Sequence, residues 1–110
     1  MTTQDILRAA RTVCPVLRCA DREQKDAALL AMADRLWSER EQILAANAQD
    51  LEAASTHISG VMLDRLALTE DRIAGMADGV RQVAQLPDPV GRALRTVERP
   101  NGLVIRKISV

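Results

Sequence analysis

The sequence predicts a mostly helical chain that ends in a β-hairpin. Apolar residues recur at helical spacing through most of residues 3–86, and capping residues stand before several of these segments. From residue 87 the pattern changes, because two prolines flank Asp88 and a segment rich in valine and isoleucine follows a Pro-Asn-Gly turn. The chain has 110 residues, of which 47% are apolar, so it can form one small domain with a thin core.

Two helices are predicted in the first third of the chain. The first covers residues 3–13, and Pro15 should end or kink it. The second covers residues 22–37 and begins after Asp21, which forms a capping box with Gln24. The apolar side of the first consists of Ile6, Leu7, Ala10 and Val13, and that of the second of Leu29, Ala33, Leu36 and Trp37, with Met32 beside it.

A third helix is predicted over residues 39–56, where Ser38 and Glu41 would form a second capping box. Its inner side consists of Ile43, Leu44, Asn47, Leu51 and Ala54. Gly60 interrupts the pattern, and a short helix over residues 61–67 follows.

The fifth helix is predicted over residues 70–86, with Thr69 as its N-cap. Leu86 should close it, because Pro87 disfavours a helical residue before it. The apolar face consists of Ile73, Met76, Val80 and Val83. We therefore divide the chain into a helical segment, residues 1–86, and a proline-rich turn with a hairpin, residues 87–110.

The hairpin prediction fixes a register for its two strands. Pro100, Asn101 and Gly102 suit a three-residue loop in which the glycine takes the left-handed conformation. This loop would place Val97 opposite Ile105, Leu94 opposite Ile108, and Arg95 opposite Lys107. The last pair brings two like charges together, which is mildly unfavourable unless an edge faces solvent or an acidic neighbour.

The composition excludes several classes of protein. Basic and acidic residues number 15 each, and Trp37 is the single aromatic residue, so we expect no nucleic-acid partner. No apolar run is long enough to span a bilayer, and the N-terminus lacks the apolar core of a signal peptide. We therefore expect no membrane partner and a cytoplasmic location, which suits the two cysteines.

Few residues are candidates for chemistry. Cys14 and Cys19 have no partners that would complete a zinc site or activate a thiol, and His57 stands alone in a polar loop. We interpret Asn47, on an apolar helix face, as tying its helix to a neighbouring backbone, with a ligand role as the alternative. Arg65 could hold a carboxylate or phosphate, although a structural ion pair is the simpler interpretation.

The sequence contains no recognisable catalytic or phosphate-binding motif. Its five glycines are scattered and form neither a dinucleotide fingerprint nor a P-loop. The tail carries a positive patch, which we interpret as solvated strand edges: Arg92, Arg95, Arg99, Arg106 and Lys107. We predict no catalytic, cofactor-binding or metal-binding residue in this chain.

The order of four motifs nevertheless resembles one enzyme family. These motifs are AANAQDL (Ala45–Leu51), LDRLALT (Leu63–Thr69), DRIAGMADGVRQVAQLPDPVG (Asp71–Gly91) and RPNGL (Arg99–Leu103). Together they resemble the N-terminal region of gamma-glutamyl phosphate reductase, also called glutamate-5-semialdehyde dehydrogenase, of the aldehyde dehydrogenase superfamily. The resemblance covers about residues 20–110, although STHISG (Ser55–Gly60) departs from the expected Gly-Leu-Ser type of turn.

The resemblance implies that the chain is the front portion of a larger α/β enzyme. That family reduces gamma-glutamyl phosphate to glutamate 5-semialdehyde with NADPH in proline biosynthesis, through a thioester on a cysteine. The catalytic cysteine and the nucleotide-binding elements of the family lie downstream, so only structural elements carry over to this sequence. These elements are Asn47, Asp50, Leu63–Leu66 and Pro87–Gly91.

The resemblance also implies partners for the chain. The hairpin would lead toward a cofactor-binding domain, the remainder of the enzyme would cover the exposed faces, and the whole could form a homo-oligomer. On this interpretation the isolated chain is inactive and binds no NADPH. The alternative is a standalone helical module that acts through its apolar stripes in interaction or oligomerisation.

Overall fold

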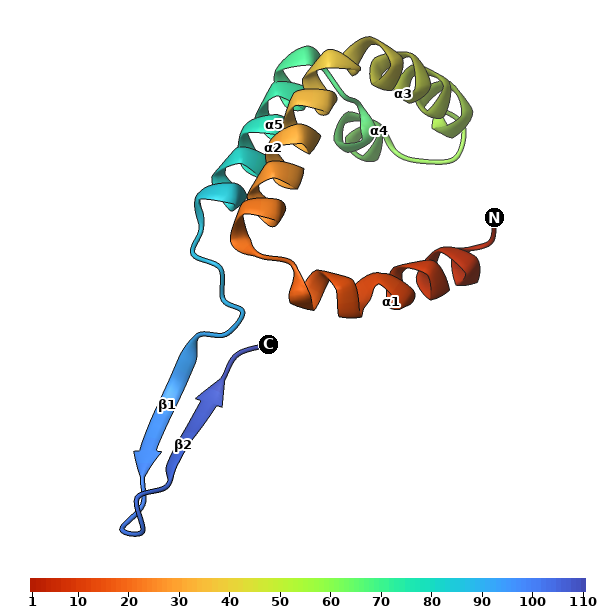
Figure 1. The fold of residues 1–110 in the computed structure, drawn as a ribbon. Helices are drawn as coiled ribbons and strands as arrows, with labels where there is room; N and C mark the ends of the chain where they lie inside the picture. The colour runs from red at the N-terminus through yellow and green to blue at the C-terminus, as the bar shows by residue number, and fades with distance from the viewer. The chain divides into compact units, whose positions relative to one another are not determined.

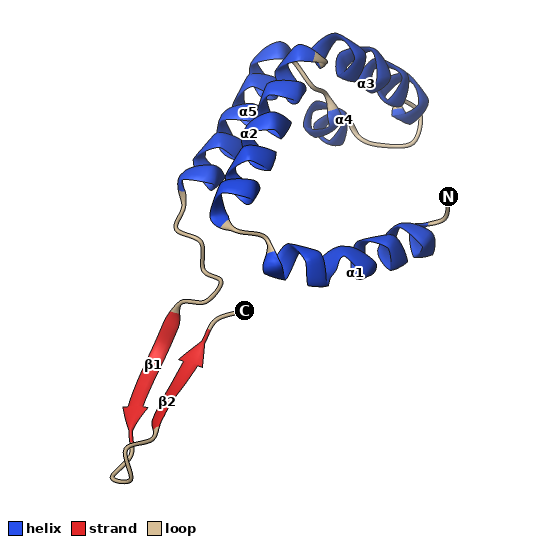
Figure 2. Cartoon of the chain, viewed as in Figure 1, coloured by secondary structure: helices blue, strands red, loops and turns tan.

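A computed structural model describes all residues 1–110, as five helices followed by an antiparallel hairpin (Figures 1 and 2). This confirms the predicted fold class. The elements are α1 (Thr3–Cys19), α2 (Arg22–Ser38), α3 (Arg40–Ala54), α4 (Gly60–Leu66), α5 (Glu70–Gln85), β1 (Ala93–Glu98) and β2 (Val104–Ile108).

The chain forms two compact units, and one boundary between them falls after residue 86. The terminal unit combines Met1–Lys25 with Pro87–Val110, and the central unit is Asp26–Leu86. We describe each unit by itself below.

The central unit has a small core made mostly of alanine. Its buried apolar residues are Ala33 of α2 and Ile73, Ala77 and Ala84 of α5. Helices α2 and α5 lie side by side (Figure 1), and the Arg81 guanidinium reaches Asp34 across them at 3.1 Å. Alanine side chains bury little apolar area, so this core is small.

The buried face of α5 differs from the predicted one. Ile73 is completely buried, but Met76 and Val83 are 44% and 51% exposed, whereas Ala77 and Ala84 lie in the core. The helical spacing of the apolar residues was predicted correctly, but the buried side of the helix is rotated toward Ala77 and Ala84. Choosing the largest apolar residues was misleading, because the helix buries two of its alanines while Met76 and Val83 stay exposed.

Two of the predicted caps are confirmed and one is wrong. Asp21 and Gln24 form the reciprocal capping bonds at 2.8 and 3.2 Å, and the Thr69 hydroxyl accepts from the Arg72 amide. Ser38, in contrast, belongs to α2, where its hydroxyl donates to the Arg35 carbonyl. Glu39 takes the N-cap position of α3 and makes no side-chain capping bond.

Helix α1 continues past Pro15 to Cys19, so the expected end near residue 13 is wrong. A proline removes only its own backbone donor and already has a helical φ, so the amides that follow it can still bond within the helix. The Thr2–Asp5 capping box holds the first turn, and Arg18 is in the last turn, where a cation is favourable. No residue of α1 is buried.

The hairpin has the predicted turn and most of the predicted register. Gly102 has φ +85°, and Val97 and Arg95 pair with Ile105 and Lys107. The pairing of Leu94 with Ile108 is wrong, since Ala93 faces Ile108 and the ladder is irregular between Ala93 and Arg95. The extra residue of such a bulge shifts the register by one.

A part-buried ion pair joins the two segments of the terminal unit. The Lys25 ammonium lies 2.7 Å from the Asp88 carboxylate, which also accepts from the Val90 amide at 3.0 Å. At the base of the hairpin, the Ser109 hydroxyl donates to the Pro89 carbonyl, and the Gly91 amide donates to the Ser109 carbonyl at 2.9 Å. The Pro-Asp-Pro corner is thus bonded to both α2 and the end of β2.

This ion pair predicts a loss of stability in acid. The hydrogen bond from Lys25, followed by the amide of Val90, lowers the pKa of Asp88 below its usual 3.8. The stabilisation is therefore complete above pH 3.8 and is lost as the pH falls through the lowered value.

We expect Asp88→Asn to be less stable than the natural chain at neutral pH and to lose less stability on acidification. Thermal melts from neutral to acid pH check this, with Glu98→Gln as a matched exposed control, because Glu98 makes no ion pair in the structure. Parallel pH profiles for the natural chain and Asp88→Asn would contradict the role of Asp88.

Candidate functional site

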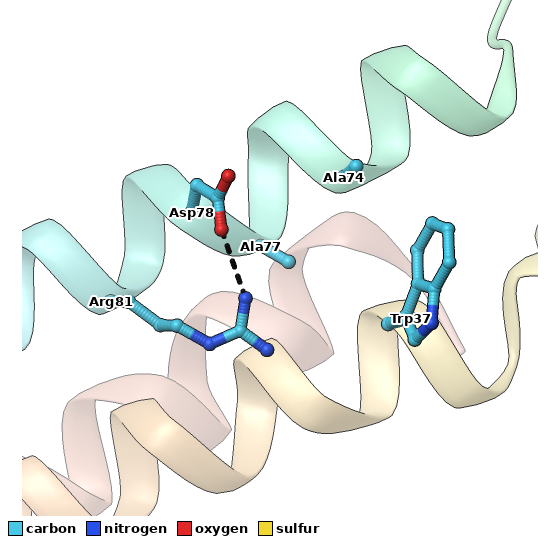
Figure 3. A pocket seen from close by; sticks show the side chains of 5 residues that line it. All are labelled: Trp37, Ala74, Ala77, Asp78 and Arg81. Atoms are coloured by element: carbon cyan, nitrogen blue, oxygen red, sulfur yellow. Dashed lines mark hydrogen bonds and ion pairs between the residues drawn. The ribbon is translucent and has the colours of Figure 1, made fainter.

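A depression of about 260 Å³ lies between α2 and α5 in the central unit (Figure 3). Trp37 of α2 lines it together with four residues of α5: Ala74, Ala77, Asp78 and Arg81. The small alanine side chains leave the space open, and Trp37 remains 42% exposed beside it. The chain has no other aromatic residue, so this is the one place where it could stack a ligand.

The charged groups around this depression are already paired. Figure 3 shows Arg81 bonded to Asp78 at 3.0 Å, and the same guanidinium bonds Asp34. The Asp34 carboxylate, followed by that of Asp78, raises the pKa of Arg81. Beside it, the Arg40 guanidinium lies 4.5 Å from the centre of the Trp37 ring and pairs with Glu70 at 3.3 Å. These contacts join α2, α3 and α5, so the arrangement is better suited to holding helices together than to binding an anion.

Asn47 ties α3 to the segment between α4 and α5. Its side chain is 7% exposed, its amide donates to the Leu66 carbonyl at 3.0 Å, and its oxygen accepts from the Leu68 amide at 2.8 Å. Both polar atoms of the side chain are therefore satisfied by backbone, as the structural interpretation requires. Arg65 lies exposed on α4 without an ion pair, while Arg72 pairs with Asp64 and bonds the Ala67 carbonyl.

The remaining candidate residues are not brought together. Cys14 and Cys19 are free and exposed on α1, and His57 contacts its neighbour Thr56 and the Ala53 carbonyl near the end of α3. The structure contains no group of three or more side chains that could hold a metal ion. None of its helices combines the length and apolar character needed to span a bilayer.

Three of the five basic tail residues lie on one face of the hairpin, in the terminal unit. A shallow groove of about 390 Å³ is lined by Arg95, Val97, Arg99, Ile105 and Lys107, which we call the basic face. Arg95 and Lys107 are cross-strand partners, as are Val97 and Ile105. None of the three cations has an ion-pair partner in the chain, so the basic face combines unpaired positive charge with apolar side chains.

Sequence reasoning missed three long-range ion pairs, of which Arg40–Glu70 spans 30 residues. Lys25 and Asp88 are 63 residues apart, and Asp34 and Arg81 are 47 residues apart. The spacing of Asp78 and Arg81 on one helix was a local signal for part of the Asp34–Arg81 pair. No local pattern pointed to Asp34 or Lys25.

The chain is similar in sequence to curated reductases. It is 52% identical over 110 residues to the gamma-glutamyl phosphate reductase of Koribacter versatilis, covering 100% of this chain and 26% of that protein. It is 53% identical over 105 residues to the same enzyme of Neisseria meningitidis, covering 96% and 25%. No family model matches the chain. The chain thus spans about a quarter of the length of these relatives.

Solved structures give the same result. The gamma-glutamyl phosphate reductase of Thermotoga maritima matches with a TM-score of 0.80 and 36% identity, over 86% of this chain and 23% of that one. That of Saccharomyces cerevisiae matches with a TM-score of 0.86 and 30% identity, over 98% and 28%. The family resemblance predicted from the motif order is therefore confirmed.

Proposed function

We propose that this chain, which is similar over its whole length to one quarter of gamma-glutamyl phosphate reductase, is the N-terminal portion of such an enzyme. The observation that supports this most directly is an identity of 52% across all 110 residues. A shared module in otherwise unrelated proteins would be expected to match relatives of several kinds. The two solved structures with TM-scores of 0.80 and 0.86 bear the same enzyme name.

The proposed enzyme reduces gamma-glutamyl phosphate to glutamate 5-semialdehyde with NADPH, in proline biosynthesis and in the cytoplasm. We assign the nucleophile and the NADPH site to the remainder of the enzyme. Within this chain, Arg81 is occupied by two carboxylates, and the two cysteines are free and exposed on the surface. The two exposed free thiols suit a reducing compartment.

The role proposed for this chain is to support the catalytic domains. Large apolar side chains lie exposed along α1, including Leu7 at 63% and Val16 at 70%. A hairpin of two strands is marginally stable without a further strand or a covering layer. Exposed surfaces of this kind are typical of elements that pack against further protein.

A chimeric enzyme tests the proposal. The matching segment of the Neisseria meningitidis reductase is replaced by this chain, and NADPH formation from glutamate 5-semialdehyde, phosphate and NADP⁺ is followed. We expect kcat/KM within about tenfold of the unmodified reductase, since 53% identity should preserve most buried contacts. The same chimera with Cys14→Ala and Cys19→Ala should be equally active.

Two controls make the result decisive. The reductase lacking the segment should be inactive, because its catalytic domains lose their packing partner. A chimera that is folded and of normal oligomeric mass but inactive would contradict the proposal. It would favour the standalone interaction module instead.

A further inference from the structure

The zero net charge of the chain conceals an excess of acidic groups in the central unit. That unit carries five basic and ten acidic side chains, whereas the terminal unit carries ten basic and five acidic ones. The formal charges are therefore −5 and +5, with His57 neutral. The surface of the central unit thus lies in a negative field, which attracts cations and repels anions.

This negative charge is present at the depression between α2 and α5. Two carboxylates share the single Arg81 guanidinium, that of Asp78 at 3.0 Å and that of Asp34 at 3.1 Å. Each uses only its Oδ1 atom, so both Oδ2 atoms have no hydrogen-bond partner in the chain. One guanidinium against two carboxylates leaves a formal charge of −1. A ligand with a positive group would balance this charge, whereas an anion would increase the imbalance.

Trp37 supplies aromatic surface to the same depression. Figure 3 shows its indole ring at one end, the ion-paired Arg81 at the other, and Ala77 between them. The Arg40 guanidinium lies 4.5 Å from the ring centre, but Arg40 does not line the depression, and Trp37 is still 42% exposed. Indole rings attract cations and pack against other aromatic rings. The open part of Trp37 is therefore suited to an aromatic ligand that carries positive charge.

The size of the depression limits the ligand. Its α5 lining, Ala74, Ala77, Asp78 and Arg81, has the spacing i, i+3, i+4, i+7 of one helix face, and the two alanines leave the middle of this face low. The volume is about 260 Å³. An apolar cavity of about 150 Å³ holds one benzene molecule. The depression thus has room for one aromatic ring and a short side arm.

We propose that this depression binds a small organic cation, an aromatic ring joined by a short arm to a primary ammonium group. The ring packs on Trp37 and over the two alanines, and the ammonium group donates to the open Oδ2 atom of Asp78. The alanines and the indole recognise the ring, while the unbalanced carboxylate selects the positive charge. This inference concerns a binding site of the central unit and does not depend on the proposed enzymatic function.

Nuclear magnetic resonance tests the proposal directly, because the single tryptophan gives one indole N–H signal. The probe is benzylamine, which is protonated at neutral pH, and it is titrated at low salt into the ¹⁵N-labelled chain. Benzyl alcohol and phenylacetate offer the same ring with a neutral and an anionic group. We expect benzylamine to shift the Trp37 signal saturably, with a Kd on the order of 1 to 10 mM for so open a site. Benzyl alcohol should bind about fivefold more weakly, and phenylacetate should give no saturable shift.

Two substitutions locate the ligand while they keep the reporter. Asp78→Asn removes the negative charge and should weaken benzylamine binding about fivefold. Ala74→Leu fills the depression and should abolish the saturable shift. The matched controls are Asp50→Asn and Ala45→Leu, because both residues are exposed on α3 and Asp50 makes no ion pair. Both controls should bind benzylamine like the natural chain, after circular dichroism has verified that all four variants are folded.

Four results would overturn the proposal. A benzylamine titration without saturation would show that no site exists. Equal affinity for benzylamine and benzyl alcohol would show that the carboxylates do not select a cation. Tighter binding of phenylacetate would mean that Arg81 attracts an anion instead. Unchanged benzylamine binding by a folded Ala74→Leu chain would place the ligand outside this depression.

Discussion

Replacing Ile73 with alanine is expected to lower the free energy of unfolding by about 3 kcal/mol. Ile73 is 0% exposed and is the largest side chain that the chain buries completely. The rest of the buried apolar core consists of alanines, which are too short to fill the space that the substitution would leave. Urea denaturation followed by circular dichroism measures the loss.

Two substitutions calibrate this result. Ile73→Val removes one methyl group and should cost about 1 kcal/mol. Val83→Ala alters a residue of the same helix that is 51% exposed, and it should change stability by less than about 0.5 kcal/mol. An equal loss for Ile73→Ala and Val83→Ala would mean that Ile73 does not anchor the core.

The second large effect is expected at Asn47, where alanine should cost about 2 to 3 kcal/mol. The substitution removes the partners of the Leu66 carbonyl and the Leu68 amide in a part-buried region. The Leu66 carbonyl ends α4 and the Leu68 amide lies in the link to α5, so the loss should also loosen that connection. Hydrogen exchange of the Leu68 amide would report the loosening directly.

Matched variants separate the hydrogen bonds of Asn47 from helix propensity. Gln49→Ala removes an exposed amide from the same helix and should be nearly neutral or slightly stabilising. Asn47→Asp keeps an acceptor for the Leu68 amide but cannot donate to the Leu66 carbonyl when ionised. We expect its stability to be intermediate near neutral pH, and a neutral effect of Asn47→Ala would contradict the structural role.

Local chemistry explains which features could be predicted from the sequence. The caps at Asp21 and Thr69 and the turn at Gly102 were predicted correctly, because each depends on bonds within about four residues. The register next to the turn was also correct, since the loop fixes it. The register failed at Leu94, where a bulge far from the turn changes the pairing.

Local rules failed where two sequence patterns competed for one residue, and where tertiary packing determined which residues of a helix are buried. Ser38 could cap α3 or end α2, and in the structure it is the last residue of α2. The buried face of α5 contains Ala77 and Ala84 while Met76 and Val83 are exposed, and the apolar spacing of the sequence did not distinguish the two sets. The role of Asn47 was anticipated because an amide on an apolar face must find partners, but those partners could not be named from the sequence.

The sequence by itself determined the helices, the hairpin, the family resemblance and the identity of every charged residue. Only the tertiary structure decided which charges belong together. The Lys25–Asp88 ion pair joins segments 63 residues apart, and the terminal unit contains both segments. This grouping divides a neutral sequence into units of formal charge +5 and −5. The physical reason is that capping and periodicity act over a few residues, whereas such a grouping depends on how the chain returns through space.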